Sequence, residues 1–178
     1  MARNFHTVAV PFRALFITTY IDMTEQLEVR RISSPETVAL RREVLRPDRS
    51  LEESIFPGDD YSTTEHWGAF IGDELVGVAS IYPEPLPLEV ALPTTGSTWR
   101  LRGMAVAEGR RNRGVGKVLL DACIQSIRSN GGTLLWCNAR STAINFYQRE
   151  GFESCSEDFE IPDIGPHRVM VRELQGVT

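Results

Sequence analysis

The sequence of 178 residues has no excess of positive charge and only three cysteines. Its formal net charge is −5, whereas binding along a nucleic-acid backbone requires a basic surface, so nucleic acid is not expected as a partner. Cys123, Cys137 and Cys155 are odd in number and lack the spacing of a metal site. We therefore expect no metal and three reduced, largely buried thiols, as in a cytoplasmic protein.

Long apolar runs are also missing. Residues 1–21 contain no acidic side chain, but their apolar stretches are short and are broken by Pro11, so neither a membrane-spanning helix nor a membrane partner is expected. We divide the chain into an N-terminal extension of uncertain status, residues 1–27, and one domain, residues 28–176. The extension fits an upstream start codon with the fold beginning after Met23, a cleaved targeting peptide, or an arm that packs on a partner subunit.

Strand and helix patterns alternate along the rest of the chain. Strands are expected at 27–32, 67–71, 75–82, 99–106, 133–138, 153–160 and 167–174, and helices at 34–46, 115–129 and 142–150. A further short helix and turn are expected within 51–61, and four prolines make 83–93 a loop. This order predicts a mixed α/β fold in layers.

A glycine-rich, basic stretch separates the strand that ends at Val106 from the helix that begins at Val115. The start of a helix carries unpaired N–H groups and a partial positive charge, and glycine lets an anion approach the backbone closely. Arg110, Arg111, Arg113 and Lys117 add full positive charges at the same point. The stretch is therefore predicted to bind phosphate.

Two common phosphate motifs do not fit this stretch. A nucleoside-triphosphate loop needs Lys directly after its second glycine, where Val115 stands, and the dinucleotide fingerprint needs a glycine at position 119, which is Leu. The pattern that fits is Arg-x-x-Gly-x-Gly, formed by Arg111, Gly114 and Gly116. A second pattern follows in 138–152, Asn-Ala-Arg-Ser-Thr-Ala-Ile-Asn-Phe-Tyr-Gln-Arg-Glu-Gly-Phe.

These two patterns, in this order, resemble the signatures of the GNAT superfamily of N-acetyltransferases, which bind acetyl-coenzyme A. The resemblance is clear over about residues 75–174. It identifies 28–176 as a single GNAT domain of the mixed α/β, α+β-like class. It implies a central, mostly antiparallel sheet of about six or seven strands, splayed between strands 4 and 5, with about four helices on both faces.

The resemblance also implies a coenzyme site without metal. The backbone of Met104, Ala105 and Val106 would pair with the pantetheine arm as an added strand. Two asparagines, Asn138 and Asn145, would also contact the coenzyme. The pyrophosphate would lie on the segment that contains Arg111, Asn112, Arg113, Gly114, Val115, Gly116 and Lys117.

The family's reaction is direct attack of an amine on the thioester, which needs a proton for the departing thiolate. Tyr147 is the candidate donor, since a phenol with a pKa near 10 stays protonated at neutral pH. Many relatives take the amine proton with a glutamate on the fourth strand, but residues 100–102 here are Arg-Leu-Arg. The base is left open among water, His167, Glu65 and His66.

The sequence therefore predicts a cytoplasmic, acetyl-CoA-dependent N-acetyltransferase whose acceptor is a small-molecule amine or a protein amino group. Transfer of another acyl group, or a non-catalytic module that senses acyl-CoA, are the alternatives. Dimerisation is common in such enzymes, so a homodimer is allowed for. The acceptor is not predicted, because the loops that would surround it carry no signature.

Overall fold

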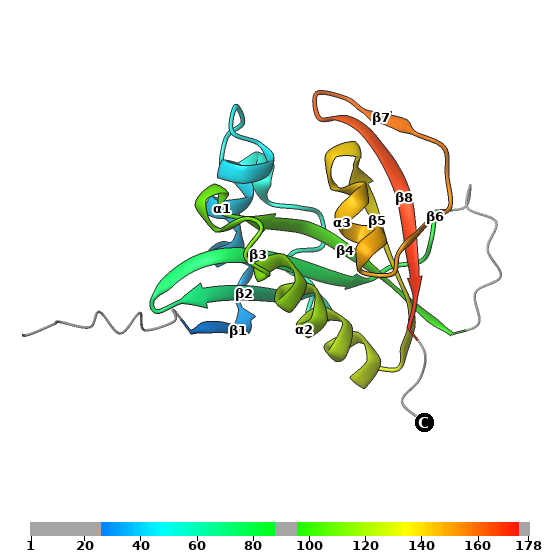
Figure 1. Cartoon of the computed structure of the whole chain (residues 1–178), viewed down its shortest axis with the longest axis horizontal. Coiled ribbons are helices and arrows are strands. Elements are labelled where there is room, and N and C mark those ends of the chain that lie inside the picture. Colours follow the sequence, from blue (N-terminus) through cyan, green and yellow to red (C-terminus); the bar gives the residue numbers. More distant parts are fainter. Residues whose placement is uncertain (1–25, 88–95, 175–178) are drawn as a thin grey trace, which may run out of the picture.

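The computed structural model describes residues 26–87 and 96–174 (Figure 1). The N-terminal extension up to residue 25 and the proline-rich loop at 88–95 lie outside the described residues, so their interpretation stays a prediction. The elements in chain order are β1 (Leu27–Ile32), α1 (Ser34–Leu45), η1 (Glu52–Ser54), β2 (Glu65–Ile71), β3 (Glu74–Pro83), β4 (Ser97–Val106), η2 (Glu108–Arg110), α2 (Val115–Ser129), β5 (Gly132–Arg140), η3 (Ser141–Ala143), α3 (Ile144–Arg149), β6 (Glu153–Ser154), β7 (Phe159–Ile161) and β8 (Gly165–Glu173).

All strands belong to one sheet in the order β1-β2-β3-β4-β5-β8-β6, with β7 also paired to β8. Every pairing is antiparallel except that of β4 with β5, which is parallel. The predicted mixed, mostly antiparallel sheet is confirmed. The sheet has 8 strands because the expected strand at 153–160 is interrupted and forms β6 and β7 instead.

Helices cover both faces of the sheet (Figure 1). On one face α1 packs against β3 and β4, where Leu40 lies beside Val78 and Ala105. On the other face α2 packs against β2, β3, β4 and β5 and covers the largest apolar core. That core includes Ala69, Val76, Ile81, Leu101, Leu119, Leu120, Cys123, Ile127, Leu135, Cys137, Tyr147 and Met170. The described residues contain three α-helices, since 51–61 forms only η1 and turns.

The ends of the two longer helices follow from their sequences. Ser33 and Glu36 form a capping box at the start of α1, with Pro at the first turn. The helix α2 begins after Gly114 and ends at Ser129, with Asn130 as its C-cap and Gly131 at φ +74° after it. Within the described ranges no helix is long and apolar enough to cross a membrane.

A buried charge network lies on the α1 face of β3 and β4. The guanidinium of Arg41, which is 0% exposed, forms an ion pair with Asp59 at 2.6 Å and donates to Ser80 Oγ at 2.6 Å. The Tyr82 hydroxyl donates to Asp59, and His66 contacts Ser80 Oγ at 2.6 Å. Burial alone would raise the pKa of Asp59, but hydrogen bonds from Arg41 and Tyr82 outweigh it, and the pKa is lowered. These paired charges link α1, the 51–61 segment and the sheet.

Candidate functional site

The strands β4 and β5 stop pairing well before they end. Their parallel register runs only from Ser97 opposite Gly132 to Arg100 opposite Trp136. Beyond this point β4 continues to Val106 and β5 continues to Arg140, each hydrogen-bonded only to its outer neighbour. Of the three residues Met104, Ala105 and Val106, Met104 and Val106 therefore direct their N–H and C=O groups into a divergence between the strands, whereas Ala105, opposite Val78, pairs with β3. Met104 and Val106 are among the residues whose backbone groups are predicted to pair with the pantetheine arm.

A β-bulge on β4 marks the start of the divergence. The register with β3 shifts between Val78 and Ser80, so that two residues of β4, Gly103 and Met104, lie opposite one residue of β3. Gly103 has φ +63°, and a Cβ atom there would lie 2.6 Å from Nε of the buried Arg41. Glycine is therefore required both by the backbone conformation and by the buried charge network beneath it.

The predicted phosphate segment forms the turn between β4 and α2, beside this divergence. Gly114 caps α2 with φ +82°, and Asn112 also has a positive φ, +60°. Within the described part of the chain, no backbone or side-chain acceptor takes the first-turn N–H groups of Val115, Gly116 and Lys117. A Cβ at Gly114 would meet no atom within 4 Å, so the turn is open to solvent. The segment has the unpaired N–H donors that an anion requires.

The charged side chains of this segment are only partly available. Arg111 and Arg113 are exposed, and Arg111 Nε donates to the carbonyl of Val106 at 3.3 Å. Lys117 is paired with Asp121 at 2.8 Å and lies 3.5 Å from a carboxylate oxygen of Glu150. The backbone N–H groups of the turn, together with Arg111 and Arg113, therefore carry most of its attraction for phosphate.

Tyr147, from α3, lies across the divergence on the α2 face. Its hydroxyl donates a hydrogen bond to Met104 Sδ of β4 at 3.8 Å, and the thiol of Cys137 on β5 lies beside it. The rings of Phe146 and Phe152 pack edge-on against it at 5.1 and 5.2 Å between centroids. Burial raises the pKa of Tyr147 well above its usual value, so the phenol stays protonated at neutral pH.

The two predicted asparagine contacts differ in position. Asn138 is on β5 beyond the last pairing with β4, and its Oδ1 is buried without a hydrogen-bond partner within the described residues. A buried acceptor of this kind is costly unless a ligand donates to it. Asn145 is exposed on α3, with no hydrogen bond to the described part of the chain. The structure places Asn138 at the divergence, and the contact of Asn145 with the coenzyme stays a prediction.

Two of the three candidate bases have structural partners elsewhere. Glu65 is paired with Arg31 at 2.7 Å and accepts hydrogen bonds from Ser126 and Asn130, near the far end of α2. His66 is enclosed in the buried charge network, with its Nε2 2.9 Å from the carbonyl oxygen of Asp59. Both ring nitrogens of His66 have partners, so it has no lone pair to offer a substrate.

His167 is placed differently. It lies on β8 opposite Arg140 of β5, and directly opposed residues of an antiparallel pair point to the same face of the sheet. Its Nδ1 is 2.7 Å from the carbonyl oxygen of Gly165, which can only accept, so Nδ1 carries the proton and Nε2 keeps a lone pair. Burial, assisted by the positive charge of Arg140, lowers the pKa of His167.

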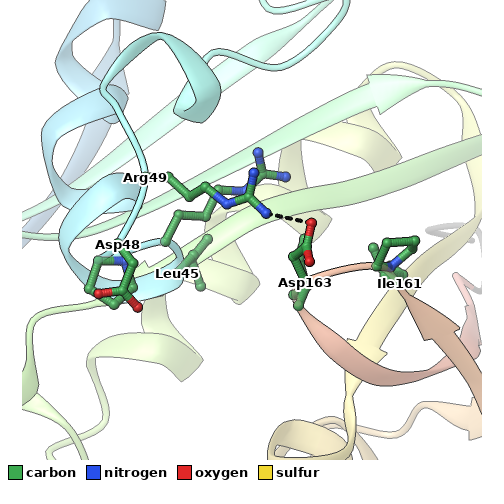
Figure 2. A pocket seen from close by; sticks show the side chains of 9 residues that line it. Leu45, Asp48, Arg49, Ile161 and Asp163 are labelled. Atoms are coloured by element: carbon green, nitrogen blue, oxygen red, sulfur yellow. Dashed lines mark ion pairs between the residues drawn. The ribbon is translucent and has the colours of Figure 1, made fainter.

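A cavity of about 330 Å³ opens on the α1 face, between the end of α1 and the β7–β8 turn. Figure 2 shows Arg49 reaching across it to Asp163, to which it is paired at 2.9 Å. Leu45, on the cavity wall, accepts a hydrogen bond from Arg140 at 2.6 Å through its carbonyl oxygen. The cavity therefore adjoins the end of β5.

Sequence reasoning missed the arginines on this face. From the sequence alone, Arg102 is only a residue at a position where many relatives have glutamate, and Arg46 is only the end of a helix. Arg102 and Arg46 both stack on Phe56, with guanidinium carbons 4.6 and 5.0 Å from the ring centroid. Alternation along β4 could have placed Arg100 and Arg102 on one face, but their meeting with α1 depends on the tertiary fold.

Comparison with known proteins agrees with this geometry. The family model described as the acetyltransferase (GNAT) family matches residues 28–152. A protein of Bacillus subtilis (strain 168), named as the uncharacterized N-acetyltransferase YitI, is 36% identical over 149 residues, which cover 84% of this chain and 97% of that protein.

Two solved structures share the fold at low sequence identity. Escherichia coli ElaA superimposes with a TM-score of 0.65 at 22% identity, covering 83% of this chain and 100% of that one. An aminoglycoside 6'-N-acetyltransferase complexed with coenzyme A superimposes with a TM-score of 0.61 at 13% identity, covering 85% of this chain and 99% of that one.

Proposed function

We propose, from the premise that this chain belongs to the acetyltransferase (GNAT) family, that it moves an acetyl group from acetyl-CoA directly to a primary amine. Acyl transfer from acetyl-CoA is the family's general activity. The single observation that carries the proposal is the end of β4–β5 pairing at Arg100 and Trp136, with the open turn of α2 beside it. The acceptor is the amine of a small molecule or of a protein.

The divergence and the turn have the groups that a coenzyme A molecule needs. The free backbone edge of β4 at Met104–Val106 offers donors and acceptors to the amides of the pantetheine arm. The N–H groups that begin α2 face outward where the pyrophosphate would lie. Asn138 Oδ1, buried without a partner, is suited to an amide N–H of the coenzyme.

Tyr147 is proposed to supply the proton for the leaving thiolate. The amine nitrogen bonds to the thioester carbonyl carbon, the C–S bond breaks, and the sulfur takes the Tyr147 proton. The position of the hydroxyl between Met104 of β4 and Cys137 of β5 supports this role. Burial keeps the phenol protonated, so its proton is available when negative charge develops on the departing sulfur beside it.

His167 is proposed to take the proton that the amine loses. Its neutral form is favoured by burial, and its Nε2 lone pair is free of partners within the described residues. It lies on the face opposite Tyr147, so an amine approaching from the α1 side would have the acid and the base on different sides of the thioester. A chain of water molecules is the alternative base.

We further propose that residues 28–176 act as one domain, supported by β1 and β8 belonging to one sheet. A cytoplasmic location is proposed because the reaction draws on acetyl-CoA and because the three cysteines are free thiols.

Gly114→Val is expected to weaken acetyl-CoA binding at least about tenfold, because a side chain at φ +82° distorts the turn that presents the N–H donors. Isothermal titration calorimetry measures the affinity. Gly131→Val is the matched control. Gly131 also has a positive φ, +74°, and open space around it, but it lies at the opposite end of α2. Equal affinity of the two variants would remove the turn from the coenzyme site.

Tyr147→Phe is expected to lower kcat by about 10²-fold or more while acetyl-CoA affinity stays the same, because only the proton donor is lost. Release of free coenzyme A thiol measures the rate. Tyr61→Phe, at a tyrosine that is 66% exposed, is the control for the substitution itself. If Tyr147→Phe keeps the wild-type kcat, another group protonates the thiolate.

The pH dependence of kcat/KM tests His167. The free amine and the free base must both be neutral, so log kcat/KM should rise with a slope of about two below the pKa of His167 and about one above it. Since burial lowers that pKa, the change of slope is expected below pH 6.5. His167→Gln should show a slope of about one throughout. A wild-type slope of one over the whole range would favour water as the base.

A further inference from the structure

The α1 face of the divergence carries three arginine side chains from three distant parts of the chain. Arg46 follows α1, Arg102 is on β4 and Arg140 ends β5. Arg46 and Arg102 share the ring of Phe56, and Arg140 reaches Leu45, the residue before Arg46. The fold therefore collects three guanidinium groups around the end of α1, where Arg46 also lines the cavity.

None of these three guanidinium groups forms an ion pair with the described part of the chain. Within the described residues, none of the three has a carboxylate oxygen within 4.0 Å. Their hydrogen bonds go to neutral carbonyl oxygens: Arg46 to Glu53, Arg102 to Pro57 and Arg140 to Leu45. A guanidinium has five N–H donors, so most donors of each group remain for another partner.

Other arginines nearby do have acidic partners. Arg41 is paired with Asp59, Arg100 with Glu84, and Arg49 with both Glu53 and Asp163. The excess of positive charge is confined to this part of the surface, because the chain as a whole has a net charge of −5. An acidic protein that leaves three half-buried guanidinium groups without a counter-charge at one place has a site suited to an anion.

The neighbourhood of these groups opposes their positive charge. Burial is the main cause that lowers the pKa of all three groups, and a neighbouring arginine adds to it in each case: Arg49 at Arg46, Arg100 at Arg102 and Arg46 at Arg140. Acidic residues offset this lowering of the pKa only in part, Glu53 at Arg46 and Glu84 and Asp59 at Arg102. An oxyanion placed among them would relieve this repulsion and accept planar, paired N–H bonds. Asp48, which also lines the cavity, is exposed, so its carboxylate can be solvated away from the arginines.

We infer that the acceptor amine carries an oxyanion, a carboxylate or a phosphate, which Arg46, Arg102 and Arg140 bind while the amine reaches the thioester. The inference rests on the proposed function and names the class of its substrate. The two oxyanions are recognised by the same guanidinium chemistry, and the arms of the experiment distinguish them. Unsubstituted amines would leave the arginines without a partner and would react more slowly.

The test measures thiol release from acetyl-CoA with three matched pairs of amines: glycine and methylamine, L-phenylalanine and 2-phenylethylamine, and O-phosphoethanolamine and ethanolamine. Each kcat/KM is divided by the fraction of neutral amine at the assay pH, so that differences in basicity do not enter. The oxyanion-bearing member of at least one pair is expected to exceed its twin by about tenfold or more. The pairs that show the preference tell carboxylate from phosphate.

Three variants, Arg46→Gln, Arg102→Gln and Arg140→Gln, should each reduce the preference by raising KM for the oxyanion-bearing amine, with less effect on its neutral twin. Arg128→Gln is the control, because it removes the same charge from the exposed part of α2, on the other face of the sheet. A preference that survives all three variants unchanged would contradict the assignment of these arginines.

Calorimetric titration of the same amine pairs into protein saturated with coenzyme A gives a second readout that does not need turnover. The same preference in affinity is expected. Equal or weaker binding of every oxyanion-bearing amine, with no preference in the rates, overturns the inference. Acetyl-CoA is titrated in the same series: intact acetyl-CoA binding without an oxyanion preference overturns this inference alone, whereas absent acetyl-CoA binding overturns the proposed function as well.

Discussion

The site depends on the point where hydrogen bonding between β4 and β5 stops, at Arg100 and Trp136. Two parallel strands that stayed paired to their ends would leave no backbone groups for a ligand and no passage between the faces of the sheet. The bulge at Gly103 turns β4 away, and the buried pair of Arg41 and Asp59 supports it from the α1 side. The bulge thus packs against a buried ion pair, and breaking a buried ion pair by removing one partner is costly.

The divergence separates two kinds of surface. On the α2 face, apolar and aromatic side chains surround Tyr147, and the N–H groups of the first turn of α2 lie nearby. On the α1 face, Arg140 and His167 lie opposite each other on neighbouring strands, beside a cavity with charged walls. The first surface suits a long coenzyme with a thioester, and the second suits a polar acceptor. The gap between β4 and β5 connects these two surfaces, so the coenzyme and the acceptor would meet in it.

Local sequence patterns predicted the elements well where one residue type dictates the backbone. Gly114 and Gly131 marked the ends of α2, and the alternation in 27–32 matched β1. The interruption that separates β6 from β7 was not predicted, because both short strands owe their pairing to β8 rather than to their own pattern. Arg41 could not be recognised as a core residue, since its partner Asp59 is 18 residues away and an arginine on a helix is usually solvated.

In the site, too, features set by local sequence could be predicted and features set by long-range contacts could not. The coenzyme segment is continuous in the sequence, so its glycines and arginines could be read together. The proposed acceptor side combines the end of α1 with β4, β5 and β8, and no local pattern joins these elements. The sequence leaves the base open among water, His167, Glu65 and His66, and only the structure gives Glu65 and His66 other partners. The role of each of these residues depends on long-range contacts, which a single sequence does not display.

Hydrogen–deuterium exchange with and without acetyl-CoA tests the central claim most directly. If the coenzyme pairs with the free edge of β4 and its phosphates lie on the turn before α2, amides in 104–106 and 114–117 should exchange more slowly on addition of acetyl-CoA. Within 104–106 the change is expected at Met104 and Val106, because the amide of Ala105 is already directed to β3. The amides of 98–100, where β4 is already paired with β5, should be unaffected. Protection elsewhere, with no change at 104–106 and 114–117, would contradict the account.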